Sequence, residues 1–291
     1  MTGLSLALVL LSALCHVTWN LLLKRSGNQE VFAWALLIAG SVMLAPLAVA
    51  LFWFHPIGMP GWWFVTATMA LHVLYFFLLG RAYSRGDLSL VYPVARGIGP
   101  MFVPIMAVLI LGETVALPAA IGIMLIIVGI FIVSWWGRFA EVISKPSLLL
   151  RGAGMGYAIL TGLVITVYTL VDKQGVEHVQ PFLYMYFLIL GSGAGLAPYI
   201  LRSYGLLPVL QEWRQNAWPI LASGLLVFAA YGLVLTAFSL SRVSYIAPAR
   251  EVGIVVSVLM GALLLKESFG RGRLLGSAFI VAGLALIALS P

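Results

Sequence analysis

The chain has 291 residues, of which 63% are hydrophobic and only 9% are charged. Because ordinary soluble domains carry roughly a quarter charged residues, this composition excludes a soluble globule and a disordered chain. A membrane-crossing helix takes about 20 apolar residues, and at about 28 residues per helix and loop the length accommodates ten spans and no separate water-soluble domain. The single cysteine, Cys15, excludes an internal disulfide and a cysteine-based metal cluster.

Charges and Gly/Pro clusters divide the chain into ten apolar stretches, which predict an all-α integral membrane protein. In chain order they are 4–23, 31–54, 61–84, 88–111, 117–136, 150–171, 181–201, 217–240, 244–265 and 271–289. The first stretch has no basic segment before it and no good cleavage site, so we interpret it as a retained span and not as a signal peptide. The longest polar stretches, 137–149 and 203–216, are expected to be loops.

The two halves of the chain resemble each other, which predicts two five-helix repeats over residues 1–140 and 148–291. Because each repeat has an odd number of spans, the two are expected to lie in opposite orientations. This inverted-repeat architecture is typical of secondary transporters, whose substrate site lies near the middle of the membrane. An offset of 154 residues superimposes Arg96 on Arg250, Gly99 on Gly253, Glu113 on Glu267, Gly122 on Gly276 and Gly129 on Gly283.

Fourteen of the sixteen basic residues lie near the ends of the predicted spans. Twelve of these fourteen fall in the odd-numbered loops, and only Lys173 and Arg242 lie on the other side. The positive-inside rule then places the odd-numbered loops in the cytoplasm and both termini outside, in a plasma or inner membrane. The net charge of +7 therefore indicates membrane anchoring and not a nucleic-acid partner.

The two remaining basic residues, Arg96 and Arg250, lie inside predicted spans and are repeat mates. A charge at the centre of a membrane helix costs about 2.5–3.5 kcal/mol, so intramembrane charges indicate function. We hypothesise that the pair binds an anionic group, since a guanidinium suits carboxylate, phosphate or phosphonate. The alternative is structural, with Arg250 paired to Glu251 or a helix end and Arg96 to backbone carbonyls. Prolines expected to kink the helices flank both arginines: Pro93, Pro100 and Pro248.

Glu251 is the only acid that the prediction places clearly inside a span. It is expected to neutralise Arg250, to bind a substrate ammonium or to carry a coupling proton. The other predicted substrate-binding residues are polar or aromatic side chains within apolar spans: His16, Trp19, Asn20, His72, Tyr75, Tyr92, Tyr168 and Tyr231. For the histidines, the alternative is a hydrogen bond between helices without ligand contact.

Several chemistries lack their sequence motifs. The chain has no Gly-x-x-x-x-Gly-Lys-Ser/Thr loop for ATP and no His-Glu-x-x-His metal motif. Its two aspartates, Asp87 and Asp172, are too few for a typical metal-dependent transferase. We therefore expect no enzyme activity, no cofactor and no metal site, with a membrane-embedded transferase as a remote alternative.

Three features together resemble the EamA-type members of the drug/metabolite transporter superfamily. They are the ten spans as five plus five, the run His-Val-Thr-Trp-Asn-Leu-Leu-Leu-Lys-Arg at residues 16–25, and Leu-Gly-Glu-Thr and Leu-Lys-Glu-Ser after the fourth and ninth spans. The resemblance implies a central cavity lined by spans 1, 3, 4, 6, 8 and 9, alternating access and small organic solutes. Small multidrug exporters of this superfamily use a glutamate in the first span; here His16 and Asn20 stand there, which argues against cationic drugs.

We predict a secondary transporter of a small anionic or zwitterionic organic metabolite, such as an amino acid, a carboxylate or a phosphonate-like compound. The competing interpretation is an exporter of amino acids or lipophilic drugs in which the arginines are structural. The expected partners are the small-molecule substrate and the lipid bilayer. A coupling proton or counter-substrate, the direction of transport, and a monomeric or homodimeric state are left open.

Overall fold

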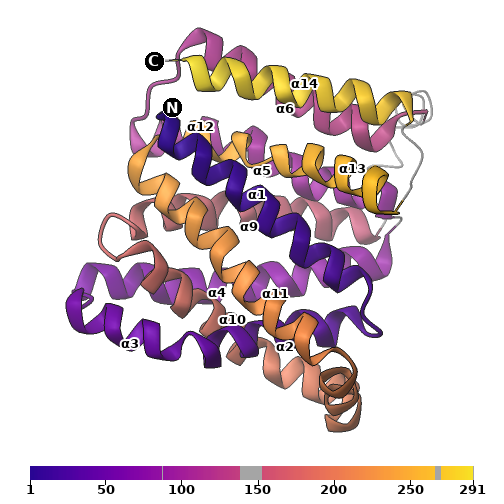
Figure 1. Ribbon diagram of the computed structural model, residues 1–291. Helices are drawn as coiled ribbons and strands as arrows, with labels where there is room; N and C mark the ends of the chain where they lie inside the picture. Colours follow the sequence, from indigo (N-terminus) through magenta and orange to yellow (C-terminus); the bar gives the residue numbers. More distant parts are fainter. Residues whose placement is uncertain (87, 138–152, 266–269, 291) are drawn as a thin grey trace. The chain divides into compact units, whose positions relative to one another are not determined.

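The computed structural model describes residues 1–86, 88–137, 153–265 and 270–290, which form α-helices and contain no strand (Figure 1). Asp87 and Glu267 lie outside the described residues, as do the basic residues of 138–152 and Lys266. The helices are α1 (Gly3–Lys24), α2 (Gln29–Met43), α3 (Ala45–Phe54), α4 (Met59–Arg85), α5 (Leu88–Leu111), α6 (Leu117–Trp135), α9 (Ala153–Gly175), α10 (Pro181–Tyr204), α11 (Leu206–Leu240), α12 (Val243–Ala249), α13 (Val252–Leu265) and α14 (Arg271–Leu289).

The helices confirm the predicted all-α membrane class. Over the described ranges, nine spans are long and apolar enough to cross a membrane, with Val243–Gly261 counted as one. A tenth results when α2 and α3 are taken as one span bent by 52°. The bend follows Leu44, and Pro46 stands at the start of α3, where its missing N–H is not needed by the helix.

The polar stretch 203–216 is helical, so its prediction as a loop was wrong. After Gly205, whose φ of +75° ends α10, the chain starts α11 at Leu206. The first part of α11 has an apolar side that packs into a core, where Val209 is buried with Val31 and Ile200. That packing stabilises a helix whose charged residues alone suggested a loop. The two parts of α11 are separated by a kink at Asn216.

The chain forms two compact units, and each draws on both halves of the sequence. One, the arginine unit, comprises Met1–Leu10, Leu74–Leu170 and Leu240–Pro291. The other, the aspartate unit, comprises Leu11–Val73 and Val171–Ser239. The division of the sequence into repeats at 1–140 and 148–291 remains a prediction.

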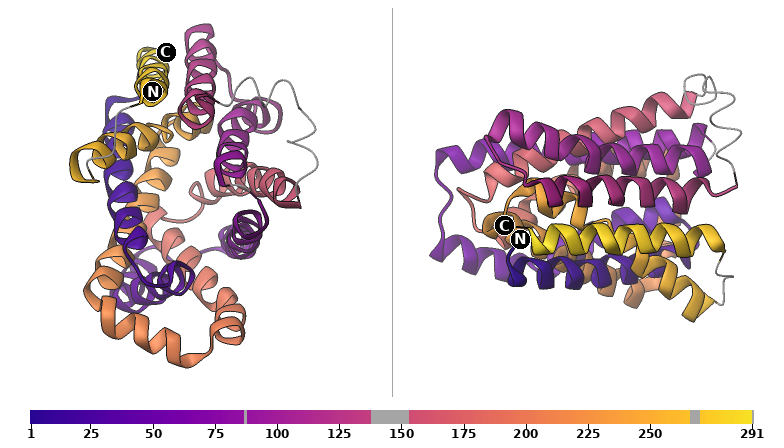
Figure 2. Two further views of the ribbon diagram at one scale, coloured as in Figure 1. Left: turned by 90° about the vertical axis from the view of Figure 1, so that its right-hand side faces the viewer. Right: turned by 90° about the horizontal axis from the view of Figure 1, so that it is seen from above.

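In the arginine unit, α6 and α14 run side by side and touch backbone to backbone (Figures 1 and 2). A Cβ added to Gly122 would lie 2.5 Å from the carbonyl oxygen of Gly283, and one added to Gly129 would lie 2.7 Å from that of Gly276. Only glycine allows helices to approach so closely, which is a common way to pack helices in a membrane.

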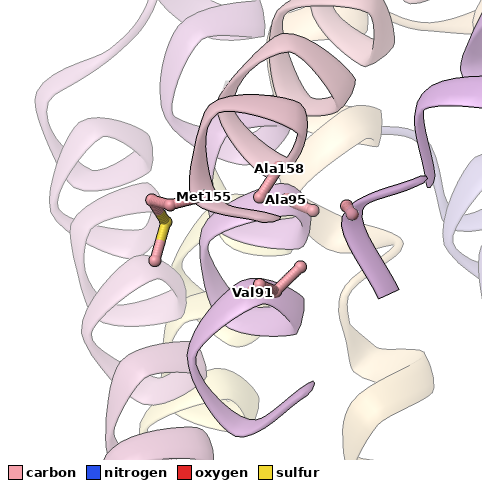
Figure 3. Close-up of a cluster of buried hydrophobic side chains, with 5 residues drawn as sticks. Val91, Ala95, Met155 and Ala158 are labelled. Atoms are coloured by element: carbon pink, nitrogen blue, oxygen red, sulfur yellow. The ribbon is translucent and has the colours of Figure 1, made fainter. Parts of the chain in front are cut away.

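Small side chains also hold α5 against α9 in this unit. Val91 and Ala95 of α5 pack with Met155 and Ala158 of α9 in a buried cluster (Figure 3). Further along the same two helices, a Cβ on Gly99 would lie 2.8 Å from Ile165. The close fit leaves little freedom to α5 at the level of Arg96, the residue that follows Ala95.

In the aspartate unit, α10 packs against α2 and α3. The indole Nε1 of Trp34 on α2 donates a hydrogen bond of 2.8 Å to the carbonyl oxygen of Gly193 on α10. Asn28 caps α2 by accepting from the backbone N–H of Val31, and Gln180 caps α10 in the same way through Leu183. These contacts hold α10, whose Tyr184 packs against Gly175 at the end of α9, to α2.

Candidate functional site

A small pocket in the arginine unit brings α5, α9 and the α12–α13 junction together. Its charged lining residues are Arg96, Arg250 and Glu251, which lie far apart in the sequence. Uncharged side chains complete the wall: Gly99, Pro100, Val103, Ile165, Tyr168, Thr169 and Ala247. Two arginines and one glutamate give the lining a formal charge of +1.

Arg96 and Glu251 form an ion pair across this pocket. Nη2 of Arg96 lies 3.5 Å from Oε2 of Glu251. The Arg96 side chain is 24% exposed and that of Glu251 is 9% exposed. Because the N···O distance is long and the Arg96 side chain is only partly buried, the two charged groups lie near each other without a tight bidentate contact.

Arg250 and Glu251 sit at a tightened turn within one membrane span. The regular helix α12 ends at Ala249, one residue after Pro248, and α13 begins at Val252. Across the turn, the N–H groups of Glu251, Gly253 and Ile254 bond to carbonyls three residues back. Short stretches of this 3₁₀ type inside a helix often mark a functional hinge. Here the turn places Arg250 and Glu251 at the pocket.

Glu113 anchors the beginning of the same span. Its two carboxylate oxygens accept hydrogen bonds of 2.9 and 3.0 Å from the backbone N–H groups of Val243 and Ser244. Next to it, Nη1 of Arg242 donates a hydrogen bond of 3.0 Å to the carbonyl oxygen of Thr114. The α5–α6 loop, which follows the helix that carries Arg96, is therefore tied to the helix that leads to Arg250.

The pocket is small, with a volume of about 20 Å³. That is room for roughly one water molecule, since a water needs about 10–15 Å³ by the same measure. An organic solute would therefore fit only after α5, α9 or the turn at Arg250 has moved. Alternating access supplies movements of this kind.

The structure brings several of the sequence-predicted residues to this pocket. Arg96, Arg250, Glu251, Tyr168 and Pro100 line it directly. Tyr75 lies behind Tyr168, with the ring centroids 5.8 Å apart in an edge-to-face arrangement.

The remaining predicted residues of this unit lie along the same spans. Pro93 and Pro100 lie inside α5, which continues through both as one helix. Pro248 precedes the turn at Arg250. Tyr92 is part of α5, but its side chain lies outside the described part of the structure.

The predicted residues of the first span fall in the aspartate unit. The rings of His16 and Trp19 meet edge to face at 5.2 Å. Asn20 donates a 2.7 Å hydrogen bond to the carbonyl oxygen of His16, one turn earlier in the same helix. Within the described residues, Nε1 of Trp19 is buried with no acceptor. A shared cavity for these residues and the arginines remains a prediction.

A buried acid that the sequence did not reveal, Asp172, joins two other predicted residues. It is fully buried in α9, and the hydroxyl of Tyr231 donates to it at 2.6 Å. The ring of Tyr231 in turn lies 5.9 Å from that of His72. Asp172 belongs to α9, a helix that runs to Gly175 and is long and apolar enough to cross a membrane. That Glu251 is the only acid clearly inside a span stays a prediction. The predicted sixth span ends at residue 171, so Asp172 fell just outside it.

Comparison with known proteins gives the family. A sequence model of the EamA-like transporter family matches residues 3–135 and again residues 152–289. A search of curated proteins found no match. A solved structure described only as "Crystal structure of protein" is similar, with a TM-score of 0.75 at 17% identity over 99% of this chain and 98% of that chain. At this identity the likeness shows the fold alone. Because the family match spans almost the whole sequence, the chain belongs to the EamA-like transporter family and is a multi-pass membrane transporter of small molecules.

Proposed function

We propose that the protein is a secondary transporter of a small anionic or zwitterionic organic solute, whose acidic group binds to Arg96 and Arg250. The observation that supports this most is the convergence of both arginines and Glu251 on one pocket. A lining with a formal charge of +1 favours an anion or a zwitterion over a cation. Amino acids, carboxylates and phosphonate-like compounds carry the planar or tetrahedral oxyanions that a guanidinium fork binds.

The Arg96–Glu251 ion pair gives the solute a way to change the pocket. In the absence of a solute, the pair neutralises Glu251 at a distance of 3.5 Å. An incoming carboxylate competes with Glu251 for the Arg96 guanidinium. If the solute is a zwitterion, the Glu251 carboxylate, once released from Arg96, accepts a hydrogen bond from the solute's ammonium group. Binding then breaks a contact between α5 and the turn at Arg250, which widens the pocket.

The competing function is export of amino acids or lipophilic drugs with structural arginines, in which the ion pair serves only to hold α5 to the α12–α13 span. One observation favours it: the space left between the lining side chains is only about 20 Å³, which is too small for an organic solute. The two functions differ in what removal of an arginine does. A binding arginine is needed for affinity, whereas a structural one is needed only for stability.

The test is a thermal-stabilisation screen of the purified protein against amino acids, carboxylates, phosphonates and a lipophilic cation. The best ligand is retested with Arg96→Ala and Arg250→Ala, and with Arg202→Ala as a control on an exposed arginine at the end of α10. A hydrogen-bonded charge is worth about 1.5–3 kcal/mol, so each pocket variant should weaken binding by roughly ten- to a hundredfold.

Two outcomes overturn the proposal. In the first, only the lipophilic cation stabilises the protein. In the second, an anionic ligand binds to both pocket variants as tightly as to wild type. A charge-neutral double variant, Arg96→Gln with Glu251→Gln, guards against misfolding because it removes both charges and leaves neither group without its counter-charge. A folded double variant that keeps full affinity for the anion counts equally against the proposal.

We place the protein in a plasma or inner membrane with the arginine-rich odd-numbered loops in the cytoplasm, on the charge bias of the loops. Labelling of a cysteine introduced at Gly270, before α14, would test this with a membrane-impermeant reagent on intact cells. Labelling without permeabilisation would overturn the orientation.

A further inference from the structure

Asp172 is held by three hydroxyl groups from three different helices of the aspartate unit. Thr68 of α4 donates to its Oδ1 at 2.6 Å, and Tyr184 of α10 donates to the same oxygen at 2.9 Å. Tyr231 of α11 donates to Oδ2 at 2.6 Å. Asp172, Thr68 and Tyr184 are completely buried. Such a convergence of donors on one carboxyl is a built site and not a chance surface contact.

No basic side chain lies within ion-pair distance of Asp172 among the described residues. Its neighbour Lys173 turns elsewhere, because its Nζ donates to the carbonyl oxygen of Phe238 at 2.8 Å and lies 3.3 Å from Glu177. The other titratable groups that face Asp172 are the two tyrosines and, through Thr68, His72 of α4. A buried carboxylate with no cation beside it is unfavourable, whereas a carboxyl that takes up a proton avoids that cost.

The hydrogen bonds around Asp172 are satisfied in both protonation states. The single hydroxyl hydrogen of Tyr184 can point to Asp172 or to the carbonyl oxygen of Phe64, which lies 3.2 Å from the same hydroxyl. With Asp172 ionised, the hydrogen points to the carboxylate. With Asp172 protonated, it points to Phe64, and the tyrosine oxygen accepts the carboxyl proton. A group that can be either charged or neutral without a lost hydrogen bond is suited to loading and unloading protons.

A path for the proton runs from Asp172 through Thr68 to His72. Nδ1 of His72 lies 3.0 Å from the Thr68 hydroxyl and 3.0 Å from the Thr68 carbonyl oxygen. When Nδ1 is protonated, it can donate to either oxygen; when it is not, it can accept a hydrogen bond from the Thr68 hydroxyl. Starting from an imidazolium and a carboxylate, the Nδ1–H bond of His72 breaks as a new O–H bond forms on Thr68. The original Thr68 O–H bond breaks as an O–H bond forms on Asp172, which leaves a neutral imidazole and a carboxylic acid.

We propose that Asp172 is a proton-binding site of this transporter and that Thr68 relays the proton between it and His72. The site lies entirely within the aspartate unit and shares no residue with the arginine pocket, although Tyr168 and Thr169 of that pocket precede Asp172 on the same helix. It supplies the transporter with a group that changes charge on proton binding, as a proton-coupled carrier requires. It does not rest on the identity of the solute that Arg96 and Arg250 bind.

The test is a pH titration of the purified full chain followed by infrared difference spectroscopy, with the proton as the only ligand. We expect a carboxylic-acid C=O band that titrates in the wild type and is lost in Asp172→Asn. The matched control is Glu212→Gln, which removes another buried carboxyl of the same unit and should keep the band. A titrating band that is the same in Asp172→Asn and in the wild type overturns the proposal, as does an Asp172 that stays ionised wherever the protein is folded.

Variants around the carboxyl keep the test decisive if Asp172→Asn does not fold. Tyr231→Phe removes the donor to Oδ2 and should move the titrating band without abolishing it; an unmoved band contradicts the assignment to Asp172. Thr68→Val removes the relay hydroxyl and should slow protonation after a pH jump, on the order of a hundredfold, whereas Thr68→Ser should restore the rate. Equal rates in Thr68→Val and the wild type overturn the relay.

Sodium is the competing ligand for a carboxyl surrounded by oxygen atoms. The titration is therefore repeated with sodium chloride replaced by choline chloride. A titration that does not depend on sodium supports a proton site. A sodium-dependent shift that disappears in Asp172→Asn overturns it in favour of a cation site. Because no solute is present, failure here leaves the arginine proposal intact, and failure of the solute screen leaves this one intact.

Discussion

The backbone contact between α6 and α14 predicts that Gly129→Ala will be less stable than a matched glycine replacement elsewhere. A Cβ at position 129 would lie 2.7 Å from the carbonyl oxygen of Gly276 and 2.7 Å from Cγ1 of Ile280. Since ordinary contact begins at 3.4 Å, the two helices would have to separate locally by about 0.7 Å. Overpacking of this kind costs about 1–3 kcal/mol. The carbonyl oxygen belongs to a backbone and has no alternative rotamer, so it cannot move aside alone.

The control is Gly156→Ala on α9, where an added Cβ meets nothing within 4 Å. Both variants gain the same helix propensity of about 0.5–1 kcal/mol, so their difference isolates the steric term. We expect Gly129→Ala to unfold with a free energy lower by about 1–3 kcal/mol than that of Gly156→Ala. Unfolding in mixed detergent micelles, followed by tryptophan fluorescence, measures this difference. Equal free energies for the two variants, within about 0.5 kcal/mol, would refute the close packing of α6 and α14.

Two carboxylates that accept hydrogen bonds from backbone N–H groups make further predictions that the same unfolding assay checks. Glu113→Ala removes the acceptor for the N–H groups of Val243 and Ser244, so we expect the free energy of unfolding to fall by about 0.5–2 kcal/mol. We also expect weaker binding of any solute found for the arginine pocket. Wild-type stability in Glu113→Ala would contradict the cap. Glu212→Ala leaves the partly buried N–H of Asn28 without its 3.0 Å acceptor and should lower the free energy of unfolding by about 1–3 kcal/mol. For Glu212, a free energy of unfolding unchanged from wild type would show that the α1–α2 connection does not depend on this contact.

The arginines illustrate how far a sequence can point to a site. Arg96 and Arg250 stood out because they are charged, lie inside apolar spans and coincide under the internal offset of 154 residues. Those are local properties that need no packing information. The partner of Glu251 is different: the sequence suggested its neighbour Arg250, and the structure adds Arg96, 155 residues away. Pairing at that separation depends on how α5 meets the turn after α12.

Asp172 illustrates what the sequence could not reveal. Asp172 stands beside Lys173, just after the predicted sixth span, which ends at residue 171. The three hydroxyl donors come from positions 68, 184 and 231, and no spacing rule links them. Tyr231 stood out in the sequence as an individual polar residue within an apolar span, and the same criterion applies to Thr68. Their common target becomes visible only once the helices are packed.

The sequence by itself determined that this is an all-α membrane protein of about ten spans and that it resembles EamA-type transporters. It did so because membrane crossing depends on the length and hydropathy of each segment and on the charges at its ends, which are properties of contiguous residues. Only the tertiary structure decided that residues 203–216 are helical, that Arg96 meets Glu251, and that Asp172 is enclosed by hydroxyls. Each of these depends on contacts between helices far apart in the chain, where glycine and alanine positions set how closely the backbones approach.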